Sequence, residues 1–375
     1  MAHVRKRVTP TGPRYDVRYT DPAGRERSKS YPRKAVADAE RARLTVQVGD
    51  GDWIDPDLAK IHLDAYARTW LAGRVDLSAN TRHSYGRVVE GWLIPQWGGH
   101  PLHAIGHEPV AAWLASIADP DRGGRSSSWA RTVRQVFGQI MDAAVRAQRI
   151  RSNPVRGAKL QRPPATTRHT YLTHEQVRAI AKGMGQRWAP VVYVLAYVGL
   201  RWSELAGLRV GDVDLLHRRF HVRHAVTTVA GRLHFDEPKG HKRRTLDYPQ
   251  LIHDRVKASA SGRPASAPLF PAAAGGWMRS RMFQEPLDRA CAAAGLPRVT
   301  PHIFRHTCAS LAVSAGANVK VVQQLLGHKS AVYTLDTYAD LFPDDLSTVM
   351  ARLDAAAGKV RRRDPDGIRP ALGSV

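Results

Sequence analysis

Residues 189–205 read APVVYVLAYVGLRWSEL, and this stretch decides how the C-terminal half of the chain folds. The run Ala189–Leu200 is almost wholly apolar, which is typical of a segment buried on all sides. We predict that it forms a helix at the centre of a domain. Arg201 follows at once, so its guanidinium is expected at the mouth of that core and not on an open surface.

The sequence on either side of this helix indicates a mixed α/β domain. Thr173 and Gln176 form the T-x-x-Q pattern of a capping box, which predicts a helix start. Residues 219–248 have strand character, with turn residues at Ala230-Gly231. Helical patterning resumes at about Arg279 and continues past Tyr338.

The middle of the chain, residues 58–150, is predicted to be a compact helical domain. Ser78 is a candidate N-cap for one of its helices, and the Ser126-Ser127-Ser128 run precedes another. Two apolar stripes at helical spacing are more consistent with core than with a binding surface. They consist of Tyr85, Val88, Val89, Trp92 and Leu93, and of Val133, Phe137, Ile140, Met141 and Ala144.

The first 50 residues alternate apolar and polar side chains in strand-like runs and then change to a helical pattern over about Arg33–Val48. We predict a three-stranded antiparallel sheet followed by a helix. The basic side chains on these strands fit either a DNA-binding face or a solvated outer face, and this segment alone does not decide between them. The candidate DNA-binding residues are Arg14, Arg18, Arg25, Arg27 and Lys29.

The composition indicates a polyanionic partner. The 375 residues include 57 Lys and Arg against 33 Asp and Glu, a formal charge of +24. The excess is +6 in residues 1–50, +1 in 51–150 and +17 in 151–375. No apolar run approaches the roughly 20 residues of a membrane span. Two cysteines predict no disulfide framework, and we expect a cytoplasmic protein of a bacterial cell that acts on DNA.

Polar residues recur at special positions in the last domain. His302 and Arg305 are three apart, so both project from one side of a helix. His328 follows the helix-ending pair Leu326-Gly327, and Tyr338 lies ten residues further on. With Arg201, and with Lys239 at a turn, these residues form a candidate site.

The motifs that carry these residues resemble those of the tyrosine site-specific recombinases, the phage-type integrases. They are GLRWSEL around Arg201, PKGHKRR around Lys239, HIFRHTCAS with His302 and Arg305, LLGHKS with His328, and TLDTYADL with Tyr338. The resemblance implies a mainly α fold with small β-sheets (α+β). It divides the chain into an arm-type DNA-binding domain (1–55), a helical core-binding domain (56–155), a linker (156–169), a catalytic domain (170–350) and a tail (351–375).

The resemblance also implies the chemistry. Arg201 and Arg305 would hold the non-bridging oxygens of a DNA phosphate, and Tyr338 would attack its phosphorus. Lys239 would give a proton to the departing 5′ oxygen. His302 and His328 would position the phosphate and assist proton transfer, and Glu204 would orient Arg201 or the histidines.

A 3′-phosphotyrosyl intermediate would keep the energy of the broken bond, so no cofactor, ATP or metal ion is expected. Two rounds of strand exchange between double-stranded DNA attachment sites would integrate or excise a phage or mobile element, with the protein as a homotetramer on DNA. A directionality factor or a host DNA-bending protein is a further possible partner. No membrane partner is expected.

Several alternatives stay open. Tyr333 is a rival nucleophile and Lys242 a rival general acid. His302 and His306 have an i, i+4 spacing that suits zinc, but the following Glu of zinc hydrolases is absent. The chain could instead be a non-catalytic DNA-binding regulator with the same fold, or a type IB-like topoisomerase that relaxes a single duplex.

Overall fold

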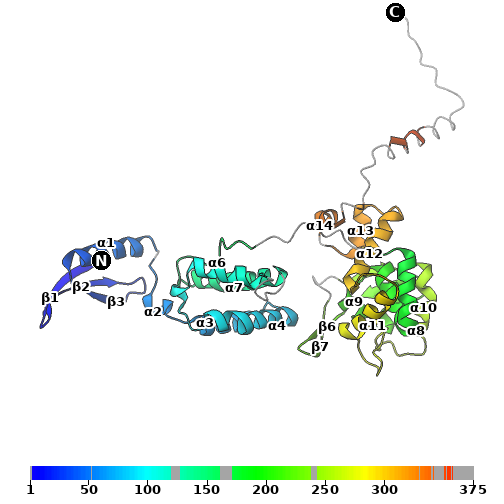
Figure 1. The fold of residues 1–375 in the computed structure, drawn as a ribbon, viewed down its shortest axis with the longest axis horizontal. Coiled ribbons are helices and arrows are strands. Elements are labelled where there is room, and N and C mark those ends of the chain that lie inside the picture. The colour runs from blue at the N-terminus through cyan, green and yellow to red at the C-terminus, as the bar shows by residue number, and fades with distance from the viewer. Residues whose placement is uncertain are drawn as a thin grey trace, which may run out of the picture. The chain divides into compact units, whose positions relative to one another are not determined.

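The computed structural model describes residues 2–51, 53–119, 127–160, 171–237, 243–328, 330–338, 341, 350–351, 353–355 and 357. Lys239 and Lys242 lie outside the described residues, as do residues 161–169 of the expected linker and 358–375 of the expected tail. The described part is mostly helical with small sheets, which confirms the predicted α+β class (Figure 1). The chain divides into two units. One contains residues 1–167, and the other contains residues 168–375 apart from the turn at 229–231.

The first unit begins with the predicted three-stranded antiparallel sheet, formed by β1 (His3–Thr9), β2 (Gly12–Thr20) and β3 (Glu26–Tyr31). Helix α1 (Lys34–Gly49) packs on one face of this sheet (Figure 1). Val17 of β2 pairs with Val4 of β1 and with Lys29 of β3, so these three side chains lie on the same face of the sheet. The small core between sheet and helix consists of Val17, Tyr19, Ala37, Leu44 and Trp53.

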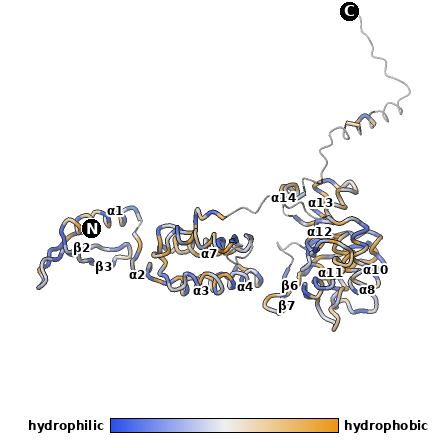
Figure 2. The backbone as a smooth tube through the Cα atoms, in the orientation of Figure 1, coloured by the Kyte–Doolittle hydropathy of each residue, from blue (hydrophilic) through white to orange (hydrophobic). Residues whose placement is uncertain are grey.

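The rest of the first unit is helical, as predicted. Its helices are α2 (Pro56–Ala59), α3 (Leu63–Gly73), α4 (Ala79–Val88), α5 (Ile94–Trp97), α6 (His107–Ile117) and α7 (Ser127–Arg146). The Ser78 side chain accepts a hydrogen bond from the Thr81 N–H, so the predicted N-cap is confirmed. The stripe from Val133 to Ala144 is fully buried along α7. Figure 2 shows hydrophobic and hydrophilic residues interleaved along these helices, as expected where one side of each is buried.

The first apolar stripe does not follow a regular α-helix. Residues Val89–Leu93 form a π-helical turn between α4 and α5. Pro95, the second residue of α5, has no N–H to donate to the preceding turn, which favours a local widening of the helix. Val88, Val89 and Leu93 are nevertheless fully buried, so their prediction as core is confirmed.

The second unit is built around α8 (His174–Val198), which packs against α11 and α12. The capping box of Thr173 and Gln176 is present, and the chain breaks its helical path at Gly185, where φ is +76°. The predicted apolar stretch is the second half of this helix. The other helices are α9 (Trp202–Gly207), α10 (His253–Ala260), α11 (Ser280–Ala293), α12 (Pro301–Ser314), α13 (Val319–Leu326) and α14 (Ala331–Tyr338).

Short strands flank the helices of this unit. Strands β4 (Val213–Asp214), β5 (Arg219–Val222) and β8 (Arg244–Asp247) form one antiparallel sheet, and β6 (Ala225–Val229) pairs with β7 (Arg232–Asp236). The predicted turn Ala230-Gly231 joins β6 to β7, with both residues at positive φ. In the larger sheet the buried Val222 of β5 pairs with Arg244, the first residue of β8. This pairing fixes the position of Arg244.

Candidate active site

Arg201 lies directly after the C-terminal end of α8. Gly199 ends the helix in the left-handed conformation, with φ +68°, and Arg201 is the N-cap of α9. A Cβ atom on Gly199 would lie 2.9 Å from Cδ2 of Leu326 and 3.1 Å from Sγ of Cys308. The glycine is therefore needed twice, for its backbone conformation and for the close approach of α12 and α13.

Glu204 is a fully buried carboxylate held by two arginines. The Arg201 N–H and guanidinium donate to it at 2.9 and 2.8 Å, and the Arg244 guanidinium donates to both of its oxygens at 2.8 Å. Burial alone would raise the pKa of the Glu204 carboxyl, but the hydrogen bonds and charges of Arg244 and Arg201 outweigh it and lower that pKa. Glu204 is thus ionised at neutral pH and fixes the direction of both guanidiniums.

Sequence reasoning missed Arg244. It considered only the lysines of the motif that contains this arginine. The burial of Glu204, which requires more positive charge than Arg201 alone provides, is visible only in the structure, so residue type and spacing did not indicate Arg244. Arg244 also contacts the turn before His328, since a Cβ atom on Gly327 would lie 3.1 Å from its Cζ.

Arg305 is nearly inaccessible, with 2% of its surface exposed. Its guanidinium donates to the carbonyl of Gly199 at 2.6 Å and to that of Leu326, at the C-terminal ends of α8 and α13. Such ends carry partial negative charge and stabilise a cation. Burial, together with the charge of Arg201, lowers the pKa of Arg305 to about 10, which leaves it charged at neutral pH. Three of its five N–H donors are not used by these two carbonyls.

His328 follows Gly327, which ends α13 with φ +62°. Its Nδ1 lies 2.9 Å from the hydroxyl of the buried Thr334, and its backbone N–H donates to the Gln323 carbonyl. Burial and the charges of Arg305 and Arg201 lower the pKa of His328 to about 4. The imidazole is therefore neutral at pH 7.

Tyr338 ends α14 and is 1% exposed. Its hydroxyl lies 2.8 Å from Nδ1 of His306, and its ring is parallel to that of His328 at 6.3 Å. Burial raises the pKa of the Tyr338 phenol, and the charge of Arg305 opposes that shift. The rival Tyr333 is 57% exposed and touches the edge of the His328 ring.

His302 and His306 lie one turn apart on α12, with ring centroids 4.5 Å apart. The charge of His302 contributes to the lowered pKa of His328, so this histidine belongs to the same cluster. Sequence reasoning considered His306 only as a metal ligand and missed its contact with Tyr338. Within the part of the chain that the structure describes, no group of three or more His, Cys, Asp or Glu residues is arranged to hold a metal ion.

The structure thus brings together Arg201, Glu204, His302, Arg305, His328 and Tyr338. Lys239 lies outside the described residues. The arrangement offers two guanidiniums, neutral imidazole and a phenol in one partly buried place. Such groups can bind a phosphodiester and attack it.

The candidate DNA-binding residues of the N-terminal sheet divide into two groups. Arg14 and Arg18 lie on the face opposite α1, because their neighbours Tyr15, Val17 and Tyr19 point to the helix. Both arginines are exposed.

The other three candidates contact acidic side chains. Arg25 contacts Asp21 and Asp55 at 3.2 and 2.9 Å, and Arg27 contacts these two and Asp57 at 2.5 to 3.2 Å. Lys29 lies 3.8 Å from Glu40 of α1. These contacts join β3 to α1 and to the start of α2.

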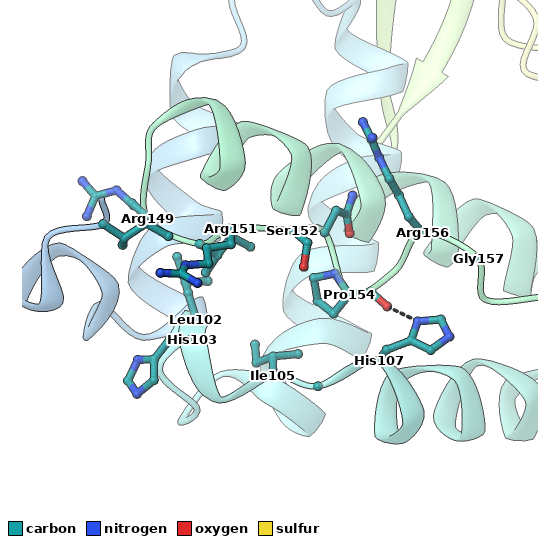
Figure 3. Close-up of a pocket in the computed structure, with 14 residues that line it drawn as sticks. Leu102, His103, Ile105, His107, Arg149, Arg151, Ser152, Pro154, Arg156 and Gly157 are labelled. Carbon is teal, nitrogen blue, oxygen red and sulfur yellow. Dashed lines mark hydrogen bonds between the residues drawn. The ribbon is translucent and has the colours of Figure 1, made fainter. Parts of the chain in front are cut away.

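A separate pocket of about 630 Å³ lies in the first unit, between the start of α6 and the segment after α7 (Figure 3). Figure 3 shows the His107 ring hydrogen-bonded to the Pro154 carbonyl, a distance of 2.8 Å. Arg149, Arg151 and Arg156 line the pocket without an acidic residue among the lining residues, and Arg156 also pairs with Asp142 at 2.9 Å. The pocket suits an anion but contains none of the predicted catalytic residues.

Comparison with known sequences identifies the family of the chain. The profile of the phage integrase family matches residues 170–344. The integrase of Mycobacterium phage L5 is 27% identical over 316 residues, which cover 80% of this chain and 83% of that protein. The tyrosine recombinase XerC of Mycobacterium leprae is 30% identical over 286 residues, 70% of this chain and 89% of that protein.

Solved structures show the same fold. The Tn1549 transposon integrase in complex with a circular intermediate DNA has a TM-score of 0.67 at 20% identity, covering 79% of this chain and 99% of that one. A lambda integrase dimer bound to a COC′ core site has a TM-score of 0.57 at 17% identity, covering 90% and 94%.

An α+β fold that gathers two arginines, two histidines and a tyrosine at its helix ends defines a DNA strand-transfer enzyme of the tyrosine type. The chain belongs to the tyrosine recombinases of the phage integrase family. No helix in the described residues is both long and apolar enough to cross a membrane.

Proposed function

We propose that this protein is a site-specific DNA recombinase that cleaves and rejoins DNA through a 3′-phosphotyrosyl intermediate at Tyr338. The observation that carries the proposal is the contact of Tyr338 with the cluster around Arg305, although the two residues come from different helices. The catalytic set is Arg201, Lys239, His302, Arg305, His328 and Tyr338, with Glu204 as an accessory residue.

The two arginines bind the scissile phosphate. Glu204 orients Arg201, and the ends of α8 and α13 orient Arg305, so neither guanidinium has to reorganise when negative charge develops on the phosphate oxygens. Arginine contacts of this kind contribute about 10³ to 10⁵ in the rate of phosphoryl transfer. His328 is neutral and therefore donates a hydrogen bond to the phosphate without adding a further charge.

Tyr338 attacks phosphorus, the bond to the 5′ oxygen breaks, and Lys239 protonates that oxygen. The phosphotyrosyl bond conserves the energy of the cleaved phosphodiester. A 5′-hydroxyl of a second duplex then attacks it, which rejoins the DNA and releases the tyrosine. Two such exchanges integrate or excise a phage or other mobile element. The integrases among the relatives, and a lambda integrase tetramer solved on a Holliday junction, support a homotetramer on DNA attachment sites.

The proposed domains divide DNA binding among them. Residues 1–55 form an arm-type DNA-binding domain, 56–155 a core-binding domain, 156–169 the linker, 170–350 the catalytic domain and 351–375 the tail. We assign DNA contact in the arm-type domain to the open face of the sheet, with Arg14 and Arg18. Arg25, Arg27 and Lys29 would have to exchange acidic partners for phosphates before they could contribute.

The test uses a library of nicked duplexes in which the sequence around the nick is randomised, so that the protein selects its own site. Cleavage next to the nick releases a short strand and traps the covalent complex. We expect a protein–DNA adduct that survives denaturation with the wild type, and none with Tyr338→Phe, which should still bind DNA. An adduct that persists in Y338F would refute the role of Tyr338. DNA binding without any adduct would favour a non-catalytic regulator, and relaxation of supercoils without site preference would favour a topoisomerase.

A further inference from the structure

His306 contacts the hydroxyl of the proposed nucleophile, Tyr338. Its Nδ1 lies 2.8 Å from the Tyr338 oxygen, and the two rings meet at 60° with centroids 5.5 Å apart. The contact is therefore made through the edge of the imidazole and not by stacking. This is hydrogen-bond distance for a proton transfer between a phenol and a general base.

We propose that His306 accepts the phenolic proton of Tyr338 when the tyrosine attacks DNA. The inference rests on the function proposed above and adds one catalytic residue to it. His306 lies outside the catalytic set, in which His302 and His328 are the histidines.

His328 is poorly suited to this task. Its ring is parallel to the Tyr338 ring with centroids 6.3 Å apart, and its Nδ1 lies at hydrogen-bond distance from the Thr334 hydroxyl, so that nitrogen already has a partner. Burial and nearby cations also lower the pKa of His328 to about 4, which makes it a weak base. A neutral histidine of this kind is better suited to donate a hydrogen bond than to take up a proton.

Helix α12 carries both His306 and the proposed phosphate ligand Arg305. Arg305 is the preceding residue and points into the core, while His306 faces α14. One rigid helix thus fixes both the proposed phosphate ligand and the group that contacts the nucleophile. The titratable and charged groups around Tyr338 and His306 include His302, Arg305 and Cys308 of α12, His328 after α13, Tyr333 of α14 and Tyr171 before α8.

The step balances as follows. The Tyr338 proton moves to Nδ1 of His306 while the phenolic oxygen bonds to phosphorus, and the bond from phosphorus to the 5′ oxygen breaks. That oxygen takes its proton from Lys239, the proposed acid. On rejoining, a 5′-hydroxyl attacks phosphorus and returns a proton to Lys239. The departing Tyr338 oxygen regains its own proton from His306.

The test measures the single-turnover rate of adduct formation on the selected nicked duplex, from about pH 6 to pH 9.5, for wild type, His306→Gln and His306→Phe. Loss of a general base typically costs about 10² to 10⁴ in rate. We expect a loss of this size at neutral pH. We also expect the variant rate to rise tenfold per pH unit where the wild-type rate is level, because the phenol must then ionise before it attacks.

A matched control is His253→Gln. It removes another histidine of the second unit that lies 3.3 Å from a tyrosine hydroxyl, that of Tyr248. This variant should keep the wild-type rate and pH profile. A second arm places a fluorinated tyrosine, whose phenol ionises more readily, at position 338. The difference in adduct-formation rate between the wild type and H306Q should then become smaller, even if the histidine variant folds less stably.

Wild-type rate in both His306 variants would overturn the proposal. So would a reduced rate with an unchanged pH profile, or a defect that the fluorinated tyrosine does not reduce, because both indicate a structural role. Absence of any adduct with the wild type would instead count against the proposed function itself, so the two failures are distinguishable.

Discussion

The carboxylate of Glu204 accepts two hydrogen bonds from Arg244, both 2.8 Å long, and Glu204 is fully buried. Arg201 contacts the same carboxylate from the other side. The pair therefore joins strand β8 to the start of α9. Removing one partner of a buried ion pair leaves a charge that water cannot solvate.

We therefore expect Arg244→Ala to lower the free energy of unfolding by about 3 kcal/mol, the lower end of the range for a broken buried pair because Arg201 remains. Adduct formation should fall as well, since Arg201 loses a fixed partner. Denaturant unfolding and single-turnover cleavage measure the two effects. The control is Arg281→Ala, which removes an exposed pair of the same length with Glu285 and should change little. Equal effects of the two variants would show that burial of Glu204 is not important.

The lowered pKa of Glu204 predicts how stability changes with pH. In the unfolded chain a Glu carboxyl titrates at about 4.3. Because its pKa is lower in the folded protein, the ionised carboxylate stabilises the fold fully above that value, and the contribution is lost as pH falls through the folded pKa. The difference in unfolding free energy between wild type and Glu204→Gln should therefore be largest near pH 7 and shrink below about pH 4. A difference that is constant over this range would contradict an ionised Glu204.

Gly199 should tolerate no side chain. Gly199→Ala places an L-residue at φ +68°, which costs about 1–2 kcal/mol, and pushes its Cβ to 2.9 Å from Leu326. Gly262→Ala is a matched control, because Gly262 has the same φ of +68° but no atom within 4 Å of the added Cβ. We expect G199A to lose clearly more stability than G262A in denaturant unfolding. It should also reduce cleavage, since the Gly199 carbonyl holds Arg305. Equal losses of stability in G199A and G262A would mean that the added methyl group is accommodated against α13 without destabilising the protein.

The open face of the N-terminal sheet should control how DNA affinity depends on salt. Each phosphate contact contributes about −0.9 to the slope of log K against log salt. Arg14→Gln with Arg18→Gln should therefore weaken binding to duplex DNA and reduce the slope by roughly 1.8. Arg27→Gln should instead lower the melting temperature, because Arg27 contacts Asp21, Asp55 and Asp57. If R27Q changed the slope and the double variant did not, the assignment of faces would be wrong.

Sequence patterns predicted the fold well where each signal is local. The capping box at Thr173, the cap at Ser78 and the buried stripe of α7 depend only on neighbouring residues, and all are present. The π-helical turn at Val89–Leu93 was missed because apolar spacing alone cannot distinguish a wider turn from a regular one.

The site was predicted less completely, because its remaining members are defined by contacts between distant segments. Arg244 reaches Glu204 across 40 residues, and His306 reaches Tyr338 across 32. Neither contact follows from residue type or spacing. Similarly, Arg27 could be separated from Arg14 only once the strand register was known.

The central claim is that Tyr338 forms the covalent bond to DNA. The most direct measurement is mass spectrometry of the denatured adduct after digestion with protease and nuclease. The account predicts that the peptide containing Tyr338 carries a nucleotide through its 3′-phosphate, and that the peptide is unmodified in Y338F. A nucleotide on Tyr333 or on any other residue would contradict it.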